Sequence, residues 1–146
     1  MLHFSQFIAT ICCAIFAGAA IYINLVEHPA RMSCGTPIAA TVWAPSYKRA
    51  TIMQAPLAIL SFIAGLSAWL LGGGIIWFAG AVLIGLVVPF TFIAIMPTNH
   101  QLLIPGRDLA STETRALLIK WSRLHAVRSL LSLLALVVYL ILLLQI

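Results

Sequence analysis

Four long apolar stretches constrain the fold of this chain more than any motif does. They cover roughly residues 5–26, 53–72, 74–96 and 125–146, and none has an acidic or basic residue in its central third. A helix needs about 20 mostly apolar residues to cross the hydrocarbon core of a membrane. Only 8% of the 146 residues are charged, against about 25% in a typical soluble domain. The sequence therefore predicts an integral membrane protein of an inner or plasma membrane.

Helices are the expected form of these stretches. Backbone groups in lipid must hydrogen-bond within the protein, and barrel strands are only about half as long. The predicted fold is an all-α, four-helix transmembrane bundle that forms one domain over residues 1–146, with two longer polar loops on one membrane side. The second and third spans are joined by the glycine turn "LLGGGIIW", whose neighbours Trp69 and Trp77 suit the lipid–water interface.

Basic residues predict the orientation of the bundle. All eight lie in or next to the two longer connections: Arg31, Lys48, Arg49, Arg107, Arg115, Lys120, Arg123 and Arg128. The positive-inside rule then places both connections in the cytoplasm and both termini outside. The net charge of +5 does not indicate nucleic-acid binding, because the basic residues border apolar spans instead of alternating with aromatics on a solvated face. Attraction to anionic lipid headgroups explains it better.

The segment "NLVEHPAR", at the end of the first span, carries a polar set at helical spacing. Asn24, Glu27, His28 and Arg31 stand at i, i+3, i+4 and i+7, which is one face of a helix. Pro29 is expected to kink or end the helix here. The place of Arg31 on this face therefore depends on the helix continuing.

The start of the fourth span repeats this spacing. In "KWSRLHAVRS", Trp121, Leu124, His125 and Arg128 fall at i, i+3, i+4 and i+7. The third span ends on the same side with Asn99 in "MPTNHQ", and the second begins there with "YKRATIMQ". Polar groups near a membrane are costly unless they face the bundle interior or a cavity. The convergence of all four spans predicts a polar pocket beneath the basic connections.

The last helix is predicted to begin near residue 112 and to run to residue 146. Ser111 is a suitable N-cap, and Glu113 in the first turn favours a helix N-terminus. Its first part would lie outside the membrane.

Individual members of the polar sets also have structural interpretations. The arginines, Lys48 and Arg49 also serve as interfacial anchors and topology signals, and Glu27 as an ion-pair partner of Arg31 or Arg128. Trp121 also fits an interface anchor. His28 and His125 are favoured as functional residues, because each lies on the face expected to point inward.

Several of these segments together resemble a known family. "HPAR", "WAPSYKRATIMQAPLA", "PTN" and "WSRLHAVRS" are similar to the small four-helix integral membrane family that includes the anthrone oxygenases. The resemblance covers nearly the whole chain. It implies an oxygenase or oxidoreductase that acts on a hydrophobic, aromatic small molecule. The positions it carries over are His28, Arg31, Tyr47, Asn99, Trp121, His125 and Arg128.

One chemistry for such a pocket needs no cofactor. A base, His28 or His125, would take a proton from an anthrone-like carbon acid, since imidazole titrates near neutral pH, and the enolate would react with oxygen. Arg31 or Arg128, with Asn99, would stabilise the oxyanion. Trp121 and Tyr47 would stack on a planar substrate, and Asn24 would also bind it.

A second chemistry uses a divalent metal. His28, His125 and Glu27 form a two-histidine, one-carboxylate set of the kind that binds iron with open positions. The neighbouring arginines would repel a cation, so this alternative is less favoured.

Other classes stay open. The same pocket would also suit a non-catalytic protein that binds a lipid or a hydrophobic metabolite. A transporter is less favoured, because its polar site is expected near mid-membrane. Expected partners are a hydrophobic small molecule and membrane lipids, and the small residues "AGAA" at 17–20 would also permit a homo-oligomer.

Overall fold

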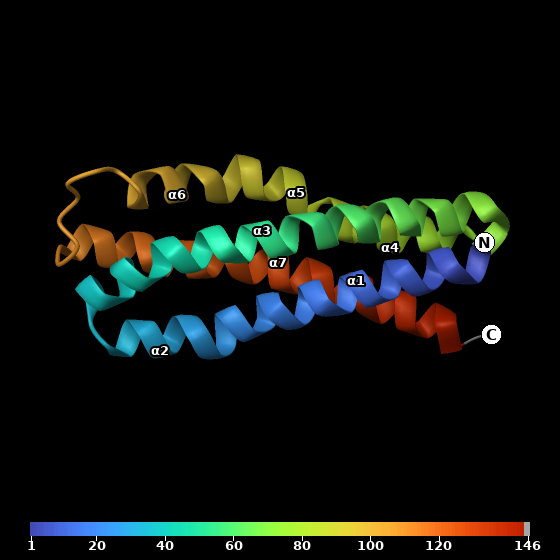
Figure 1. The fold of residues 1–146 in the computed structure, drawn as a ribbon, viewed down its shortest axis with the longest axis horizontal. Coiled ribbons are helices and arrows are strands. Elements are labelled where there is room, and N and C mark those ends of the chain that lie inside the picture. Colours follow the sequence, from blue (N-terminus) through green and yellow to red (C-terminus); the bar gives the residue numbers. More distant parts are fainter. Residues whose placement is uncertain (145–146) are drawn as a thin grey trace.

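The computed structural model describes residues 1–144 and folds them into four long helical segments (Figure 1). The first contains α1 (Leu2–Tyr22), the π-helical turn η1 (Ile23–Glu27) and α2 (His28–Ser33). The second contains α3 (Thr36–Ala68) and η2 (Trp69–Gly73). The third contains α4 (Ile75–Gly85), α5 (Val87–Phe90), η3 (Thr91–Ile95) and α6 (Met96–Leu102), and the fourth is α7 (Thr112–Leu144). All four are long and apolar enough to cross a membrane, which confirms the all-α, four-helix membrane fold.

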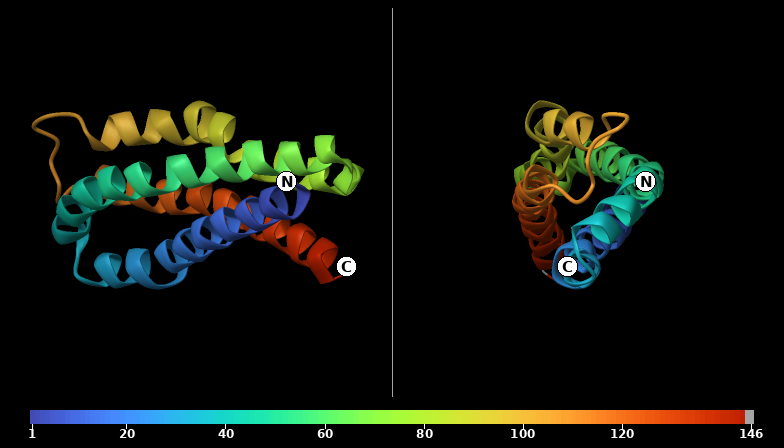
Figure 2. Two further views of the ribbon diagram at one scale, coloured as in Figure 1. Left: turned by 45° about the vertical axis from the view of Figure 1, so that its right-hand side comes forward. Right: turned by 90° about the vertical axis from the view of Figure 1, so that its left-hand side faces the viewer.

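The four segments run alternately up and down. α1 packs against α3 and α7, and α4 packs against the same two helices, so each segment has two neighbours (Figures 1 and 2). Both termini lie at one end of the bundle, and α2, α6 and the loop 103–111 lie at the other (Figure 1). We call the second end the polar end. The segments have 28 to 38 residues, so they exceed the roughly 30 Å of a hydrocarbon core at 1.5 Å per residue.

The first polar connection differs from the loop expected there. Only Cys34 and Gly35 separate α2 from α3, and the polar residues that follow are helical. Gly35 makes the turn with a φ of 90°, a conformation that glycine adopts without strain. Pro37 in the first turn of α3 is compatible with a helix start, because the N–H that it lacks would have no partner there.

Pro29 was expected to kink or end the first helix, and the helix does not end there. The helix widens into η1 just before it, where the N–H of His28 bonds to the carbonyl of Ile23, and then continues as α2. A proline ring clashes with the carbonyl four residues earlier, and a wider turn moves that carbonyl aside. The same arrangement occurs at η3, just before Pro97. Both π-helical turns lie next to the predicted polar residues.

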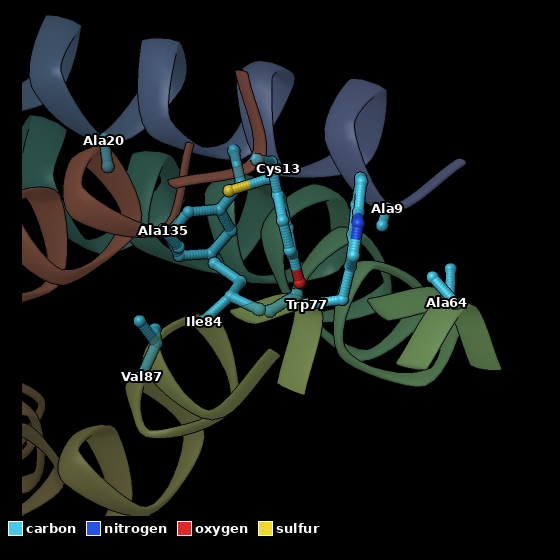
Figure 3. Packing of buried hydrophobic residues seen from close by; sticks show 12 residues of the cluster. Ala9, Cys13, Ala20, Ala64, Trp77, Ile84, Val87 and Ala135 are labelled. Carbon is cyan, nitrogen blue, oxygen red and sulfur yellow. The ribbon is translucent and has the colours of Figure 1, made fainter. Parts of the chain in front are cut away.

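The core near the termini is packed from small and aromatic side chains. Trp77 is buried, not interfacial as expected, and stacks on Tyr139 with 5.0 Å between ring centroids. Figure 3 shows Trp77 and Ile84 facing the small residues Ala9 and Cys13 of α1. The apolar environment on all sides of Trp77 outweighs the interfacial preference of tryptophan.

α7 begins as predicted. Its first turn is capped by Ser111, whose Oγ accepts a hydrogen bond from the N–H of Thr114 at 3.1 Å. The helix continues without interruption to Leu144, and the predicted end at residue 146 lies outside the described residues.

Candidate functional site

Asn24 and His125 connect the two predicted polar faces. Oδ1 of Asn24 lies 2.7 Å from Nδ1 of His125, and it also accepts a hydrogen bond from Oγ of Ser129 at 2.6 Å. The amide Nδ2 of Asn24 donates to the carbonyl of Ser122 at 3.0 Å. His125 is buried, with 2% of its surface exposed. Asn24 lies in the widened turn η1, and its side chain extends from there to α7.

This network determines which nitrogen of His125 carries the proton. The amide of Asn24 donates to a carbonyl, so its other atom is the oxygen, which can only accept. Nδ1 of a neutral His125 must therefore donate to Asn24, and Nε2 keeps its lone pair. His125 is arranged to accept a proton at Nε2.

Arg31 is buried next to this pair, and α2 holds it there. It forms an ion pair with Glu27 at 3.4 Å, and Glu27 in turn accepts a hydrogen bond from Ser46 at 2.5 Å. The guanidinium carbon lies 5.7 Å from the ring centroid of Trp121. Nε and Nη1 of Arg31 are buried without a partner in residues 1–144. Arg31 thus has N–H groups left for another acceptor.

Arg128 has a different environment. Nη2 donates to Oε1 of the buried Gln54 at 3.0 Å, and the guanidinium carbon lies 5.4 Å from the ring centroid of Phe16. Nε of Arg128 is buried without a hydrogen-bond partner, and the side chain has no ion pair within residues 1–144. Its positive charge is therefore not neutralised by a neighbouring carboxylate in this part of the chain.

Aromatic rings fill the space between the helices at the polar end. Trp121 contacts both His28 and His125, with centroid distances of 5.4 and 4.8 Å. Trp43 meets Trp121 edge to face at 5.8 Å and stacks on Tyr47 at 5.2 Å, with an interplanar angle of 1°. These contacts fix the rings at spacings typical of favourable aromatic pairs.

Two connected hollows lie beside these groups. The smaller, of about 10 Å³, has His125, Arg31, Arg128, Gln54 and Trp121 in its wall, which is room for about one water molecule. The larger, of about 90 Å³, is mostly apolar. Tyr47, Thr51 and Arg128 line both. The predicted convergence of polar residues has a real geometric counterpart, with Arg128 and Tyr47 at its boundary.

His28 and Asn99 are buried but do not line either of these two hollows. Nδ1 of His28 and both amide atoms of Asn99 have no hydrogen-bond partner in residues 1–144. The structure thus brings His125, Arg31, Arg128, Tyr47 and Trp121 to common hollows, with Asn24 behind His125. It leaves His28 in contact with Trp121 but outside the lining of both hollows.

The three proposed metal ligands do not assemble into a metal centre. Within residues 1–144, no group of three or more His, Cys, Asp or Glu side chains is arranged to hold a metal ion. Glu27 is engaged with Arg31 and Ser46, so its carboxylate is not free for a cation. The donor set therefore does not fit the two-histidine, one-carboxylate hypothesis.

Four residues that contact the predicted site residues were not themselves predicted from the sequence. They are Trp43, Ser46, Gln54 and Ser129. Helical spacing contained a signal for two of them, since Trp43 is four residues before Tyr47 and Ser129 is four residues after His125. Gln54 is polar and lies inside an apolar span, where a buried partner is expected.

Comparison with known proteins gives two matches for this chain. The family described as "Anthrone oxygenase" matches residues 43–138, which include Tyr47, Asn99, Trp121, His125 and Arg128. The anthrone oxygenase tpcL of Aspergillus fumigatus is 40% identical over 62 residues, which are 40% of this chain and 38% of the relative. The chain thus matches well under half of that relative's length. No solved structure matches the chain.

Proposed function

The chain belongs to the anthrone oxygenase family, and we propose that it oxidises the methylene carbon of an anthrone-like aromatic ketone with molecular oxygen at the polar end of the bundle. The balanced reaction is R₂CH₂ + O₂ → R₂C=O + H₂O. A C–H proton leaves first, and the electron-rich enolate then reduces oxygen and forms a C–O bond. The resulting hydroperoxide loses water and leaves the new carbonyl. The family relationship supports an oxygenase-like function, and the site geometry supports the steps below.

His125 is the proposed base. The observation that carries this proposal is its hydrogen bond to Asn24, which leaves Nε2 free to accept a proton in a wall of the polar hollow. Asn24 acts as a positioning residue, because its hydrogen bond orients the imidazole of the base. His28 also contacts Trp121, with 5.4 Å between ring centroids, and we assign it a positioning role for that ring.

Arg128 and Arg31 are the proposed stabilisers of negative charge. The enolate oxygen and the peroxide each carry negative charge, which unpartnered guanidinium N–H groups can stabilise by donating hydrogen bonds in a site with little water. Arg128 has free Nε–H and no carboxylate neighbour in the described residues, so we assign it the larger part. Asn99 has an unpartnered buried amide but lines neither hollow, so we assign it no contact with the substrate.

Tyr47 and Trp121 are the proposed substrate contacts. Tyr47 lines both hollows, and Trp121 lines the polar one. Trp43 holds Tyr47 on one face, so the remaining surface of the phenol is available to a planar ligand. No cofactor is required for the chemistry as proposed.

Oxygen uptake by the purified protein with an anthrone tests this function directly. We expect consumption of oxygen and formation of the corresponding quinone, and a loss of about 10²-fold or more in rate for His125→Ala, the range typical of a removed general base. The matched control is His100→Ala, because His100 is exposed on α6. Binding of the anthrone with no oxygen uptake by the wild-type protein would favour a non-catalytic binding protein.

We also propose that the polar end faces the cytoplasm and that both termini face outward. The proposal rests on the positions of the basic residues. Cys34 offers a test without mutation, because it is the exposed cysteine among three, while Cys12 and Cys13 are buried. A membrane-impermeant thiol reagent should label the protein only after the membrane is permeabilised. Labelling in intact cells would show that the polar end faces outward instead.

A further inference from the structure

We propose that the substrate reaches the site sideways from the bilayer, through an apolar groove between α3 and the α4–α5 junction. This inference rests on the proposed function, and it adds the route and the orientation of the substrate. The occupant is a planar aromatic ketone whose rings lie in the groove and whose oxygen points toward Arg128.

Two hollows make up the groove. The hollow of about 90 Å³ that reaches Arg128 adjoins one of about 380 Å³, since Ala58 and Val88 line both. The outer hollow is lined only by apolar residues and glycine, which are Ala58, Ile59 and Phe62 on α3 and Val82, Gly85, Leu86, Val88 and Pro89 on the third segment. A path with apolar walls therefore leads from the outer surface to the charged group.

The outer end of the groove opens onto a lipid-type surface. Ile59 and Leu86 at its wall are 48% and 46% exposed, and Phe92 at the wall of the inner hollow is 64% exposed. Large apolar side chains with this exposure are expected to face acyl chains. A hydrophobic substrate concentrates in the same phase, so the groove meets its substrate where the substrate is most abundant.

The inner end of the groove is where the polarity changes. Tyr47 and Arg128 line both the apolar hollow and the polar one, and the hydroxyl of Tyr47 donates to Sδ of Met96 at 3.7 Å. An apolar ring system is stable in the groove, but its ketone oxygen requires a hydrogen-bond donor when buried. Arg128 supplies an unpartnered Nε–H, so the ketone oxygen is directed toward Arg128.

The helix break in the third segment explains why a groove exists here. α4 ends at Gly85, Leu86 forms a turn, and Pro89 follows in α5. Prolines and short helix interruptions are the usual causes of kinks. The helix after the break, α5, can therefore diverge from α3. Side chains do not fill the space between α5 and α3.

Photolabelling with benzophenone, a diaryl ketone, tests the route independently of catalysis. The protein in lipid nanodiscs is irradiated with the probe, and labelling is compared at two methionines. Met96 lines the inner hollow and is half-buried, whereas Met53 is 46% exposed outside the groove. Exposure alone predicts more label on Met53, and the proposed route predicts more on Met96.

A blocking substitution sharpens this test. Val88→Phe places a ring where the two hollows meet, and Val127→Phe is the matched control on the exposed surface of α7, where Val127 is 38% exposed. We expect Val88→Phe to lower the labelling of Met96 about tenfold, which corresponds to about 1.4 kcal/mol of binding, and Val127→Phe to leave it unchanged. Val88→Ala should label Met96 at least as well as the wild-type protein, which excludes a general loss of folding at this position. Equal labelling of Met96 in the two phenylalanine variants would overturn the route.

Kinetics separate this inference from the proposed function. For an anthrone that partitions into lipid, Val88→Phe should raise KM about tenfold and leave kcat nearly unchanged. Selective labelling of Met96 in a protein that consumes no oxygen with any anthrone would uphold the route and reject the oxygenase activity. Oxygen uptake without selective labelling of Met96 would uphold the oxygenase activity and reject the route. An active Val88→Phe variant with an unchanged KM would also reject the route. Displacement of the probe by added lipid alone, with no competition from an anthrone, would assign the groove to an acyl chain and overturn the proposal.

Discussion

Nδ1 of His125 lies 2.7 Å from Oδ1 of Asn24, although 101 positions separate the two residues in the sequence. The contact joins the widened turn η1 to the middle of α7. It sets the tautomer of a buried imidazole, and it links the backbone irregularity next to Pro29 to the chemistry of the site. π-helical turns often occur at functional sites, and here one carries the residue that orients the candidate base.

Asn24→Ala should reduce oxygen uptake much more than Asn24→Asp. Alanine removes the acceptor for Nδ1–H of His125, so the imidazole can turn or change tautomer, whereas aspartate keeps an acceptor. We expect a loss of roughly 10–100-fold in kcat for Asn24→Ala, comparable to the loss of a partner that orients a histidine, with little change in KM. The check is a pair of steady-state oxygen-uptake measurements. Equal losses in both variants would mean that the hydrogen bond of Asn24 to Ser122, and not the one to His125, is the important contact.

Arg128→Gln should lower kcat by about 10²–10³-fold, the cost of removing one preorganised donor to a developing oxyanion. Arg128→Lys should restore part of the rate, because the charge remains while the geometry of the donors changes. Gln54→Leu should have a smaller effect, since it only frees the guanidinium that Gln54 holds at 3.0 Å. An exposed arginine, Arg123, gives the matched control as Arg123→Gln. A rise in KM with an unchanged kcat for Arg128→Gln would assign Arg128 to substrate binding alone.

Chelation should not affect the oxygenase rate. Glu27 is bonded to Arg31 and Ser46, and no three-ligand set of His, Cys, Asp or Glu is assembled in residues 1–144. Dialysis against a strong chelator, followed by elemental analysis and oxygen uptake, measures this directly. A rate that falls on chelation and returns with added iron would reinstate the metal hypothesis, and Glu27→Gln would then be the variant to examine for loss of metal.

Gly80→Ala should destabilise the bundle, whereas Gly18→Ala should not. A Cβ at residue 80 would collide with the ring of Tyr139, which is held against Trp77, while a Cβ at residue 18 meets nothing within 4 Å. Overpacking of a filled core costs about 1–3 kcal/mol, and an exposed glycine-to-alanine change in a helix gains up to about 1 kcal/mol. Unfolding in detergent, followed by circular dichroism, gives both values. Equal stabilities would show that the Tyr139 ring can move away at little cost.

The local properties of the sequence were sufficient to predict the helices and the polar end. Hydropathy over 20 residues, the spacing of Asn24, Glu27, His28 and Arg31, and the cap at Ser111 depend on residues close together in the chain. They predicted four membrane-spanning helices, the start of α7 and the convergence of polar side chains. They left open whether the helix continues past Pro29, because the π-helical turn that accommodates the proline cannot be recognised from the residue pattern.

Tertiary packing decided which polar residues pair between helices, whereas the ion pair of Glu27 with Arg31 at i, i+4 was one of the two expected from the sequence. Helix rotation and crossing place Asn24 behind His125, Gln54 against Arg128 and Ser46 against Glu27. They also leave Arg128 without a carboxylate in the described residues, and they open the groove beside Val88. Spacing along one helix specifies a face, but the partner of that face depends on neighbours from distant parts of the chain. The sequence by itself therefore determined the helices and the end at which the polar side chains gather. Only the assembled bundle determined the contact of His125 with Asn24, the environment of Arg128 and the groove beside Val88, because these depend on distances between helices.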